Sequence, residues 1–304
     1  MRRLRAIILS ALFIVPGLAH ADSPPPSPQK AVLVTGASSG IGRKIAERLA
    51  ANGYFVYATA RKDADLEALA KLPNVQAVRL DVTSPQDVAA AVDVITKAGR
   101  GLHGLVNNAG IGTGGPLVES KQEEFELAMD VNALGPVRLT RAFAPLLIAA
   151  KGRIVTIGSV SGILAGPNNS AYSMSKHAVE AFTDALAAEM KPGGVHVSVV
   201  EPGNYNSQII HNAAARMGIT SRLNDRPSEV EPVPVAAAVE HALFASDPKR
   251  RYLVVPNEPQ AQRTIRKQIA QLVELNEGHV YTYDRATLIK MLDEALAGSR
   301  PRTE

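Results

Sequence analysis

The chain has 304 residues, 46% of them hydrophobic, a formal net charge of +4 and no cysteine. This hydrophobic fraction is typical of a globular protein with a sizeable core, and the small, scattered positive excess argues against a dedicated nucleic-acid-binding protein. The absence of cysteine excludes disulfides and thiolate metal sites, and we predict no metal cofactor.

The first thirty residues differ from the rest of the chain. Arginines at positions 2, 3 and 5 precede an apolar run over Ala6–Val15, and Ala19-His20-Ala21 has the small-residue spacing of a cleavage site. This pattern predicts a secretory signal peptide over residues 1–21, then a proline-rich linker over residues 22–30, and hence a periplasmic or secreted protein. The alternatives are a twin-arginine signal, an uncleaved membrane anchor, or a misassigned start of a cytoplasmic protein. We expect membrane contact only if this segment stays uncleaved.

From residue 31 onward, short apolar runs alternate with segments of helical spacing. This alternation predicts one α/β domain over residues 31–256, with a parallel sheet of about seven strands and helices on both faces. The predicted strands are Ala31–Thr35, Tyr54–Thr59, Val75–Leu80, a run ending at Leu105–Asn107, Arg153–Ile157, Val195–Val200 and Arg251–Val255. The predicted helices are Ile41–Asn52, Asp65–Lys71, Pro85–Ala98, a long or broken helix Gln122–Ala150, Tyr172–Met190 and Val235–Ala245.

Two stretches do not follow the alternation. The segment from Gly203 to about Val233 has turn-forming residues and no strong period, which is typical of a lid or binding loop. Residues 257–304 form a predicted helical extension with two helices around Gly278. Its apolar positions Ile265, Ile269 and Leu272 predict a face that packs on the domain or on a partner chain.

A glycine-rich turn joins the first strand to the first helix. Glycines allow a tight turn and close approach of a pyrophosphate, and the N-terminus of the following helix directs amide N–H groups at the phosphates. The turn therefore predicts a dinucleotide site, and its sequence is Thr35-Gly36-Ala37-Ser38-Ser39-Gly40-Ile41-Gly42.

The second strand ends in Ala60-Arg61-Lys62, where NAD-binding proteins usually place a carboxylate. Arg61 can bind a ribose 2′-phosphate through two hydrogen bonds, and Lys62 adds a second positive charge. This favours NADP(H), with NAD(H) as the alternative because Asp63 lies close by.

Tyr172 and Lys176 lie four residues apart on a predicted helix, so their side chains share a face. A phenol with an ordinary pKa near 10 is a poor base at neutral pH, but a fixed ammonium ion nearby favours the phenolate. The pair can therefore serve as a proton donor and acceptor.

Together these motifs resemble the short-chain dehydrogenase/reductase family, over about residues 31–255. The stretch from Tyr172 to Gly203 is most similar to the branch that contains retinol, 17β-hydroxysteroid and 3-hydroxybutyrate dehydrogenases. The resemblance implies a single Rossmann-type, doubly wound domain. It rests on Thr35–Gly42, Asp81, Asn107-Asn108-Ala109-Gly110, Asn132, Ser159, Tyr172, Lys176 and Pro202-Gly203.

The resemblance also implies a catalytic set. Tyr172 would be the general acid in reduction and the base in oxidation, and Lys176 would lower its pKa and bind the nicotinamide ribose. Ser159 would hold the substrate oxygen, and Asn132 would fix a water molecule that links Lys176 to solvent. Ser161 is a second candidate for the hydroxyl, although Ser159 has the family's spacing from the tyrosine.

The implied cofactor contacts lie at the ends of the strands. Asp81 and the Val82 amide would read the adenine, Asn108 would lie beside the adenosine ribose, and Pro202-Gly203 would bend under the nicotinamide. The full predicted cofactor set is Gly36, Ser38, Ser39, Gly40, Ile41, Gly42, Arg61, Asp81, Val82, Asn108, Ala109, Gly110, Tyr172, Lys176, Pro202 and Gly203.

Four other polar residues lie near these motifs. The family usually has a threonine four residues after Pro-Gly, and Ser207 stands there as a substitute. We interpret Ser173 and Ser175 as packing or capping residues. His177 follows Lys176 but points away from the face of Tyr172, so we assign it a structural role.

The sequence thus predicts an NADP(H)-dependent enzyme that interconverts a carbonyl and a secondary or primary alcohol. The alternative is a nucleotide-binding sensor or structural protein without turnover. The segments Ile163–Asn169 and Asn204–Val233 and the tail would hold the substrate, and apolar residues in them favour a lipophilic one. By resemblance, we expect a homodimer or homotetramer formed through the helices Gln122–Ala150 and Tyr172–Met190.

Overall fold

The computed structural model describes residues 29–217 and 229–299. The predicted signal peptide and nearly all of the linker therefore lie outside the described residues, as do 218–228 of the predicted substrate loop. Within the described ranges, no helix is both long and apolar enough to cross a membrane.

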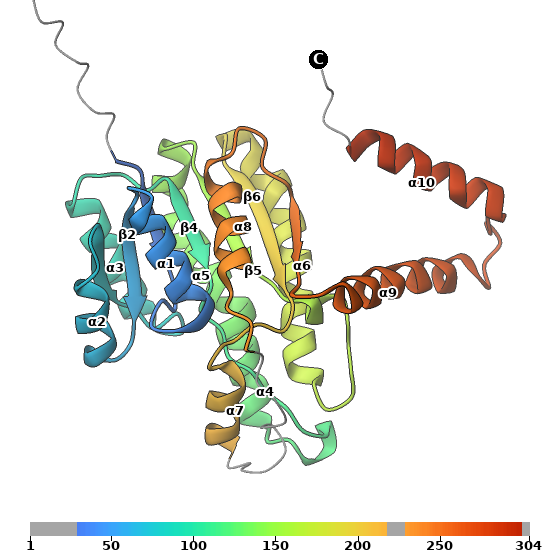
Figure 1. Ribbon diagram of the computed structural model, residues 1–304, viewed down its shortest axis with the longest axis horizontal. Helices are drawn as coiled ribbons and strands as arrows, with labels where there is room; N and C mark the ends of the chain where they lie inside the picture. Colours follow the sequence, from blue (N-terminus) through green and yellow to red (C-terminus); the bar gives the residue numbers. More distant parts are fainter. Residues whose placement is uncertain (1–28, 218–228, 300–304) are drawn as a thin grey trace, which may run out of the picture.

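Seven parallel strands form one sheet in the order β3-β2-β1-β4-β5-β6-β7 (Figure 1). The chain adds β2 and β3 on one side of β1 and then returns to add β4 on the other side, where Val32 pairs with Gly104. Ligands of such sheets bind at the carboxyl ends of the strands beside this reversal. The predicted sheet is confirmed, with strands β1 Ala31–Val34, β2 Phe55–Ala60, β3 Val75–Arg79, β4 Gly104–Asn107, β5 Arg153–Ile157, β6 His196–Pro202 and β7 Arg251–Val254.

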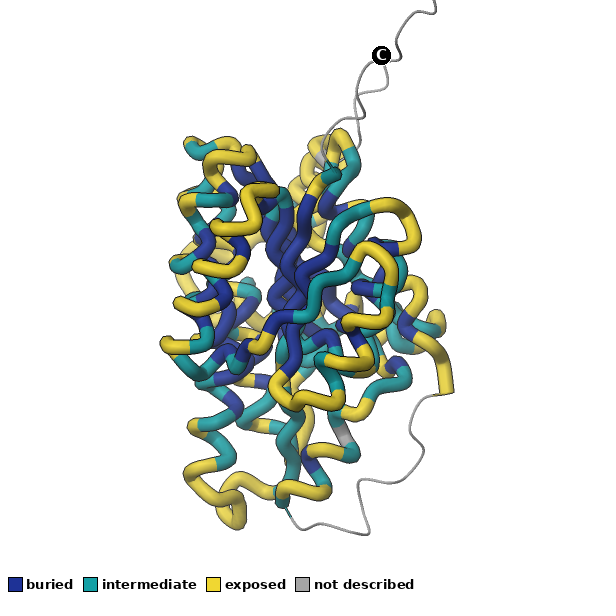
Figure 2. Tube along the Cα trace, turned by 90° about the vertical axis from the view of Figure 1, so that its left-hand side faces the viewer, coloured by how far each residue is buried: buried dark blue, intermediate teal, exposed yellow. Residues whose placement is uncertain are grey.

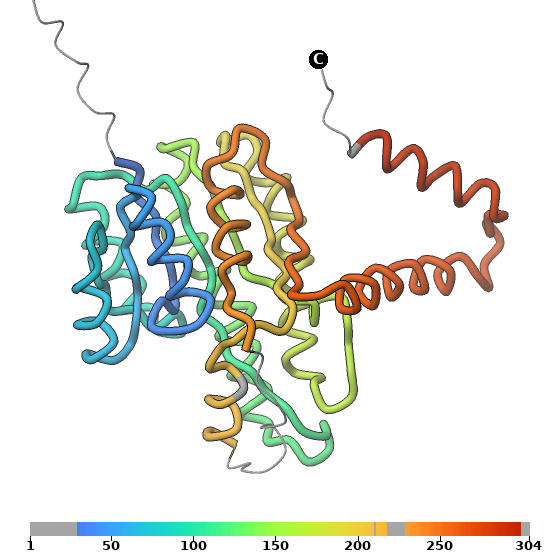
Figure 3. Tube along the Cα trace, viewed as in Figure 1, coloured from blue at the N-terminus to red at the C-terminus, as the bar shows by residue number. Residues whose placement is uncertain are grey.

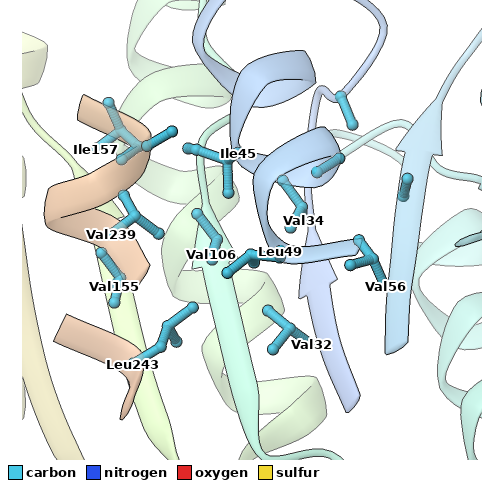
Figure 4. Packing of buried hydrophobic residues seen from close by; sticks show 14 of the residues in the cluster. Val32, Val34, Ile45, Leu49, Val56, Val106, Val155, Ile157, Val239 and Leu243 are labelled. Carbon is cyan, nitrogen blue, oxygen red and sulfur yellow. The ribbon is translucent and has the colours of Figure 1, made fainter. Parts of the chain in front are cut away.

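Helices cover both faces of the sheet, as predicted. Successive strand residues face opposite sides, so Val32 and Val34 belong to one buried cluster while Leu33 belongs to the other. Figure 4 shows the first cluster, where Ile45 of α1 and Val239 of α8 pack over the sheet. The helices of the domain are α1 Gly40–Ala51, α2 Asp63–Ala70, α3 Pro85–Lys97, α4 Gln122–Met129, α5 Gly135–Ala149, α6 Ser170–Met190, α7 Ile209–Met217 and α8 Val233–Phe244.

The second cluster lies under α3, α5 and α6, and includes Ile95, Phe143 and Leu186. Both clusters appear as one buried band through the centre of the domain, flanked by exposed helix surfaces (Figure 2). The sheet is thus held from both sides, which fixes the positions of its carboxyl ends.

The predicted long or broken helix Gln122–Ala150 consists of two α-helices joined by a π-helical turn, Asp130–Leu134. A π turn widens the backbone locally and is often found at functional sites. Asn132 lies in this turn with 1% of its surface exposed. The turn therefore directs Asn132 into the interior behind the carboxyl ends of the strands.

The expectation of a purely irregular segment after Gly203 was wrong, because α7 occupies Ile209–Met217. A helix of this length is marginal on its own and needs tertiary contacts. Ala213 is buried, and Arg216 forms an ion pair with Glu124 of α4. These contacts join segments far apart in the sequence, so the local pattern could not reveal them.

The C-terminal extension contains two helices around Gly278, as predicted: α9 Glu258–Asn276 and α10 Arg285–Ser299. The first turns of α9 join the domain, since Thr264 is buried. Beyond them the extension leaves the domain (Figure 3). Ile265, Ile269 and Leu272 each remain at least 50% exposed. Packing of this face on the domain is therefore not observed in the described chain.

Candidate active site

A cleft of about 1180 Å³ lies at the carboxyl ends of the strands. Most of its lining comes from the segments that follow β1, β2, β3, β4, β5 and β6. Every predicted cofactor residue lines the cleft, and so do Ser159, Tyr172 and Lys176. Asn132 lies one layer behind, where its Oδ1 atom would be 3.3 Å from a Cβ placed on Gly110. The fold thus brings together the residues that the sequence predicted.

The glycine-rich turn is fixed by hydrogen bonds from the segment after β4. The backbone N–H groups of Asn108 and Ala109 donate to Thr35 Oγ1 at 2.9 and 3.0 Å. The Asn108 side chain donates to the carbonyl oxygens of Thr35 and Gly36 at 2.8 and 3.1 Å. The resemblance placed Asn108 beside the adenosine ribose. In the structure its side-chain amide stabilises the glycine-rich turn.

Two glycines of the turn are required by its shape. Gly36 and Gly40 have φ of 62° and 54°, in the left-handed region. A Cβ on Gly36 would lie 2.9 Å from Ala109 Cα, so the two backbone segments approach too closely for a side chain. Ser39 precedes α1 and makes no side-chain capping bond, which leaves amides of the first turn directed at the cleft. These features fit a bound pyrophosphate.

Arg61 and Lys62 line the other end of the cleft. Arg61 Nη1 lies 3.5 Å from Asp81 Oδ2, and the Arg61 side chain is 66% exposed. Burial acts to raise the pKa of Asp81, but hydrogen bonds from Thr83 and the charge of Arg61 outweigh it and lower the pKa overall. Asp63 forms an ion pair with Arg79 and does not line the cleft. Asp63, on which the NAD(H) alternative rested, is thus paired with Arg79 outside the cleft.

Ser159 and Tyr172 meet at the middle of the cleft. Ser159 follows β5 and Tyr172 lies in the first turn of α6. Burial raises the pKa of Tyr172 above its ordinary value of 10.0, and a hydrogen bond with Ser159 opposes the rise. Ser161 instead donates its backbone N–H to Ser159 Oγ at 3.0 Å. The geometry therefore favours Ser159 over Ser161 as the hydroxyl beside Tyr172.

Lys176 lies one turn after Tyr172, with Nζ 5.7 Å from the tyrosine ring centroid. Nζ donates to the Ile157 carbonyl at 2.8 Å, and burial lowers the pKa of Lys176 to about 8. Lys176 thus lies beside Tyr172 with its ammonium group buried and directed at a backbone carbonyl. Its effect on the pKa of Tyr172 stays a prediction from the family resemblance.

Asn132 connects three segments. Its Nδ2 donates to the Ile111 carbonyl at 2.9 Å and to Ser175 Oγ at 3.0 Å, and its Oδ1 accepts from the Ile111 N–H at 2.8 Å. Ser175 also donates to the Tyr172 carbonyl at 2.7 Å. The Asn132 side chain thus ties the segment after β4 to the first turn of α6.

A family model described as short chain dehydrogenase matches residues 30–218. The chain belongs to the short-chain dehydrogenases.

The predicted branch is confirmed by the relatives of this short-chain dehydrogenase. Mitochondrial D-beta-hydroxybutyrate dehydrogenase of Bos taurus is 35% identical over 285 residues, which cover 81% of this chain and 83% of the relative. Retinol dehydrogenase 5 of Mus musculus is 33% identical, over 75% of this chain and 81% of the relative. The structure of a short-chain dehydrogenase from Sphingobium yanoikuyae in complex with NADPH has a TM-score of 0.66 at 30% identity, and covers 84% of this chain and 99% of that one.

Only part of the predicted substrate segments lines the cleft in the described residues. Of the segment Ile163–Asn169, only Asn168 and Asn169 line the cleft, so Leu164 and Ala165 do not. Of the other apolar residues on which the prediction rested, Ile209 lines the cleft and Met217 does not. Ser207 also lines the cleft, beside Gly40, as its proposed role near the cofactor requires. His177 bonds to the Ser173 carbonyl outside the cleft, in agreement with a structural role.

Sequence reasoning missed the segment Gly112–Pro116, which lines the cleft. Arg216 of α7, which lies in the predicted substrate loop, also lines the cleft and donates to the Gly112 carbonyl at 2.6 Å. From α9, Gln260 and Arg263 reach the cleft, and Gln260 Oε1 accepts from the Asn204 N–H at 3.0 Å. Gln260 and Arg263 belong to the C-terminal tail, which was predicted from the sequence as one of the substrate segments.

Proposed function

We propose that this short-chain dehydrogenase is an NADP(H)-dependent oxidoreductase that interconverts a carbonyl and a secondary or primary alcohol. The observation that carries the proposal is the cluster of Ser159, Tyr172 and Lys176 in the cleft that also holds the glycine-rich turn and Arg61. A nicotinamide dinucleotide bound there supplies or accepts the hydride.

The residues of the chain handle the proton. Tyr172 donates its phenolic proton to the carbonyl oxygen in reduction and accepts it in oxidation. Ser159 hydrogen-bonds the same oxygen and stabilises the charge that develops on it. Lys176, held by the Ile157 carbonyl, places a positive charge beside the phenol and would hold the ribose of a bound cofactor. Asn132 fixes the start of α6 against the segment after β4 through its bonds to Ile111 and Ser175.

The preference for NADP(H) over NAD(H) rests on the charges at the adenosine end. Arg61 and Lys62 line this end, whereas Asp63 is paired with Arg79. A guanidinium and an ammonium ion favour a 2′-phosphate, which a carboxylate would repel. The NADPH in the similar Sphingobium protein supports the same choice.

For the substrate we propose a lipophilic carbonyl or alcohol that carries a polar group. Retinol, named in one relative, is lipophilic, and hydroxybutyrate, named in another, carries a carboxylate. Ile209 and Val160 give the cleft apolar surface, while Asn168 and Arg216 line the same cleft with polar groups. Two further proposals remain from the sequence: export through the N-terminal segment, and assembly as a homodimer or homotetramer, supported by the exposed apolar residues Leu134 and Ile148.

The decisive test of the function is turnover of NADPH with a panel of lipophilic ketones and aldehydes. Tyr172→Phe removes the proton donor and should lower kcat by about 100- to 10,000-fold while NADPH still binds. The matched control is Tyr283→Phe in the segment between α9 and α10, far along the chain from the cleft, which should leave kcat unchanged. Tight NADPH binding without turnover of any carbonyl or alcohol would instead favour the nucleotide sensor.

A further inference from the structure

One ionisable group near the cleft has no place in this mechanism. Glu180 lies one helical turn after Lys176 on α6, and its side chain is 12% exposed. Its Oε2 accepts from Arg251 Nη1, whereas its Oε1 has no hydrogen-bond partner within the described chain. A buried carboxylate oxygen without a partner is costly to keep in a folded protein, so its position needs a reason.

The Glu180 carboxyl group lies against the turn that carries Ser159. A Cβ placed on Gly158 would be 2.7 Å from Glu180 Oε1, and one placed on Gly162 would be 2.9 Å from it. These glycines stand on either side of Ser159, so the carboxyl group fills the space between the turn and α6. It sits behind the catalytic set and out of the cleft, whose lining does not include it.

Charged groups from three elements surround Glu180. Glu201 of β6 is 3% exposed and lies 3.0 Å from Arg251 Nη1, so the two carboxyl groups share one guanidinium. Asp184, one turn further along α6, pairs with both Arg251 and Arg250 of the β7 edge. Burial and the neighbouring Glu201 raise the pKa of Glu180 to about 7, against the opposing charge of Arg251. Glu180 therefore changes charge near neutral pH.

Lys176 is the catalytic-site group that responds to this charge. Tyr172 is the titratable neighbour on its cleft side, and Glu180 is the acid that opposes the loss of its proton. The two side chains lie one turn apart on α6 and reach neighbouring backbone positions: Lys176 Nζ donates to the Ile157 carbonyl, and Glu180 Oε1 lies against Gly158, the next residue. The negative charge of Glu180 at this position favours the ammonium form of Lys176.

We propose that Glu180 is a positioning residue for the reaction, whose buried carboxylate, held by Arg251 beside Glu201, keeps Lys176 protonated from behind the cleft. This rests on the proposed function only in giving Lys176 a catalytic role. The charge relation between the two side chains can be measured without any substrate.

The experiment is an NMR titration of lysine Cε resonances in the full chain, with the Lys176 resonance assigned by its loss in Lys176→Arg. Glu180→Gln keeps the shape that fills the space beside Gly158 and removes the charge. The pKa of Lys176 should then fall by about one unit. Asp184→Asn is the matched control, because it removes the charge of another acid on α6 that also pairs with Arg251. It should leave the pKa of Lys176 unchanged.

The pH dependence of kcat provides the second readout. In Glu180→Gln the fall of kcat at alkaline pH should move to lower pH by the same amount, with KM for the carbonyl unchanged. An unshifted Lys176 titration in a folded Glu180→Gln protein overturns the inference, whatever the activity. A shifted titration in a protein that turns over no carbonyl or alcohol leaves the inference standing and refutes the proposed function.

Discussion

Cofactor preference should reverse when the charge of Arg61 is reversed. The side chain is 66% exposed and already 3.5 Å from Asp81, so a 2′-phosphate competes with solvent and with that carboxylate. Hydrogen bonds to charged groups contribute about 1.5–3 kcal/mol, and for a group this exposed we take the lower end, which is about tenfold in affinity. Arg61→Asp removes this contribution and adds repulsion of similar size, so the ratio of NADPH to NADH affinity should fall on the order of 100-fold.

The assay is calorimetric titration of both nucleotides into wild type, Arg61→Asp and Lys71→Asp. Lys71 follows α2 directly and does not line the cleft, so its substitution makes the same change in charge without touching the cofactor. Equal ratios in Arg61→Asp and wild type would refute the role of Arg61. A wild type that binds NADH more tightly than NADPH would refute the cofactor proposal as a whole.

Two other predictions concern stability. Gly36→Ala should weaken NADPH binding and destabilise the fold by more than Gly53→Ala, because both glycines have positive φ but only Gly36 is crowded, by Ala109. The backbone strain alone costs each variant about 1 kcal/mol. If thermal and chemical unfolding show the same loss of stability in Gly36→Ala and Gly53→Ala, crowding at Gly36 is contradicted. Lys176→Met should abolish turnover yet raise the free energy of unfolding at pH 7 by roughly 2 kcal/mol, since burial of the ammonium ion disfavours the folded state below the folded pKa of about 8. This gain should shrink as the pH rises from 8 toward 10.5, where the unfolded lysine also loses its proton, and a gain that is constant with pH would show that the charge is not its cause.

Much of the fold could be predicted from local patterns. A largely apolar run such as Arg153–Ile157 becomes a parallel strand with the bounds that were expected, because a strand covered on both faces is mostly apolar. The motif residues could be placed as well, since the carboxyl ends of parallel strands meet at one edge. That geometry alone brings Gly36, Asn108 and Ser159 to the same cleft.

Other features depend on contacts between distant segments. The helix α7 is held by Arg216 and its contacts with Glu124 and Gly112, more than ninety positions earlier in the chain. The periodicity of the residues in α7 does not reveal these contacts. Gln260 and Arg263 likewise reach the cleft through the packing of α9.

The sheet and the nucleotide turn follow from periodicity and from the order of motifs along the chain, and the candidate catalytic residues follow from the family resemblance. The charges that act on these residues could be learned from the folded chain alone. The fold pairs Asp63 with Arg79, directs Lys176 at the Ile157 carbonyl and buries Glu180 beside Glu201. These neighbours come from strands and helices that lie far apart in the sequence, whereas a pKa depends on burial and on charges nearby in space.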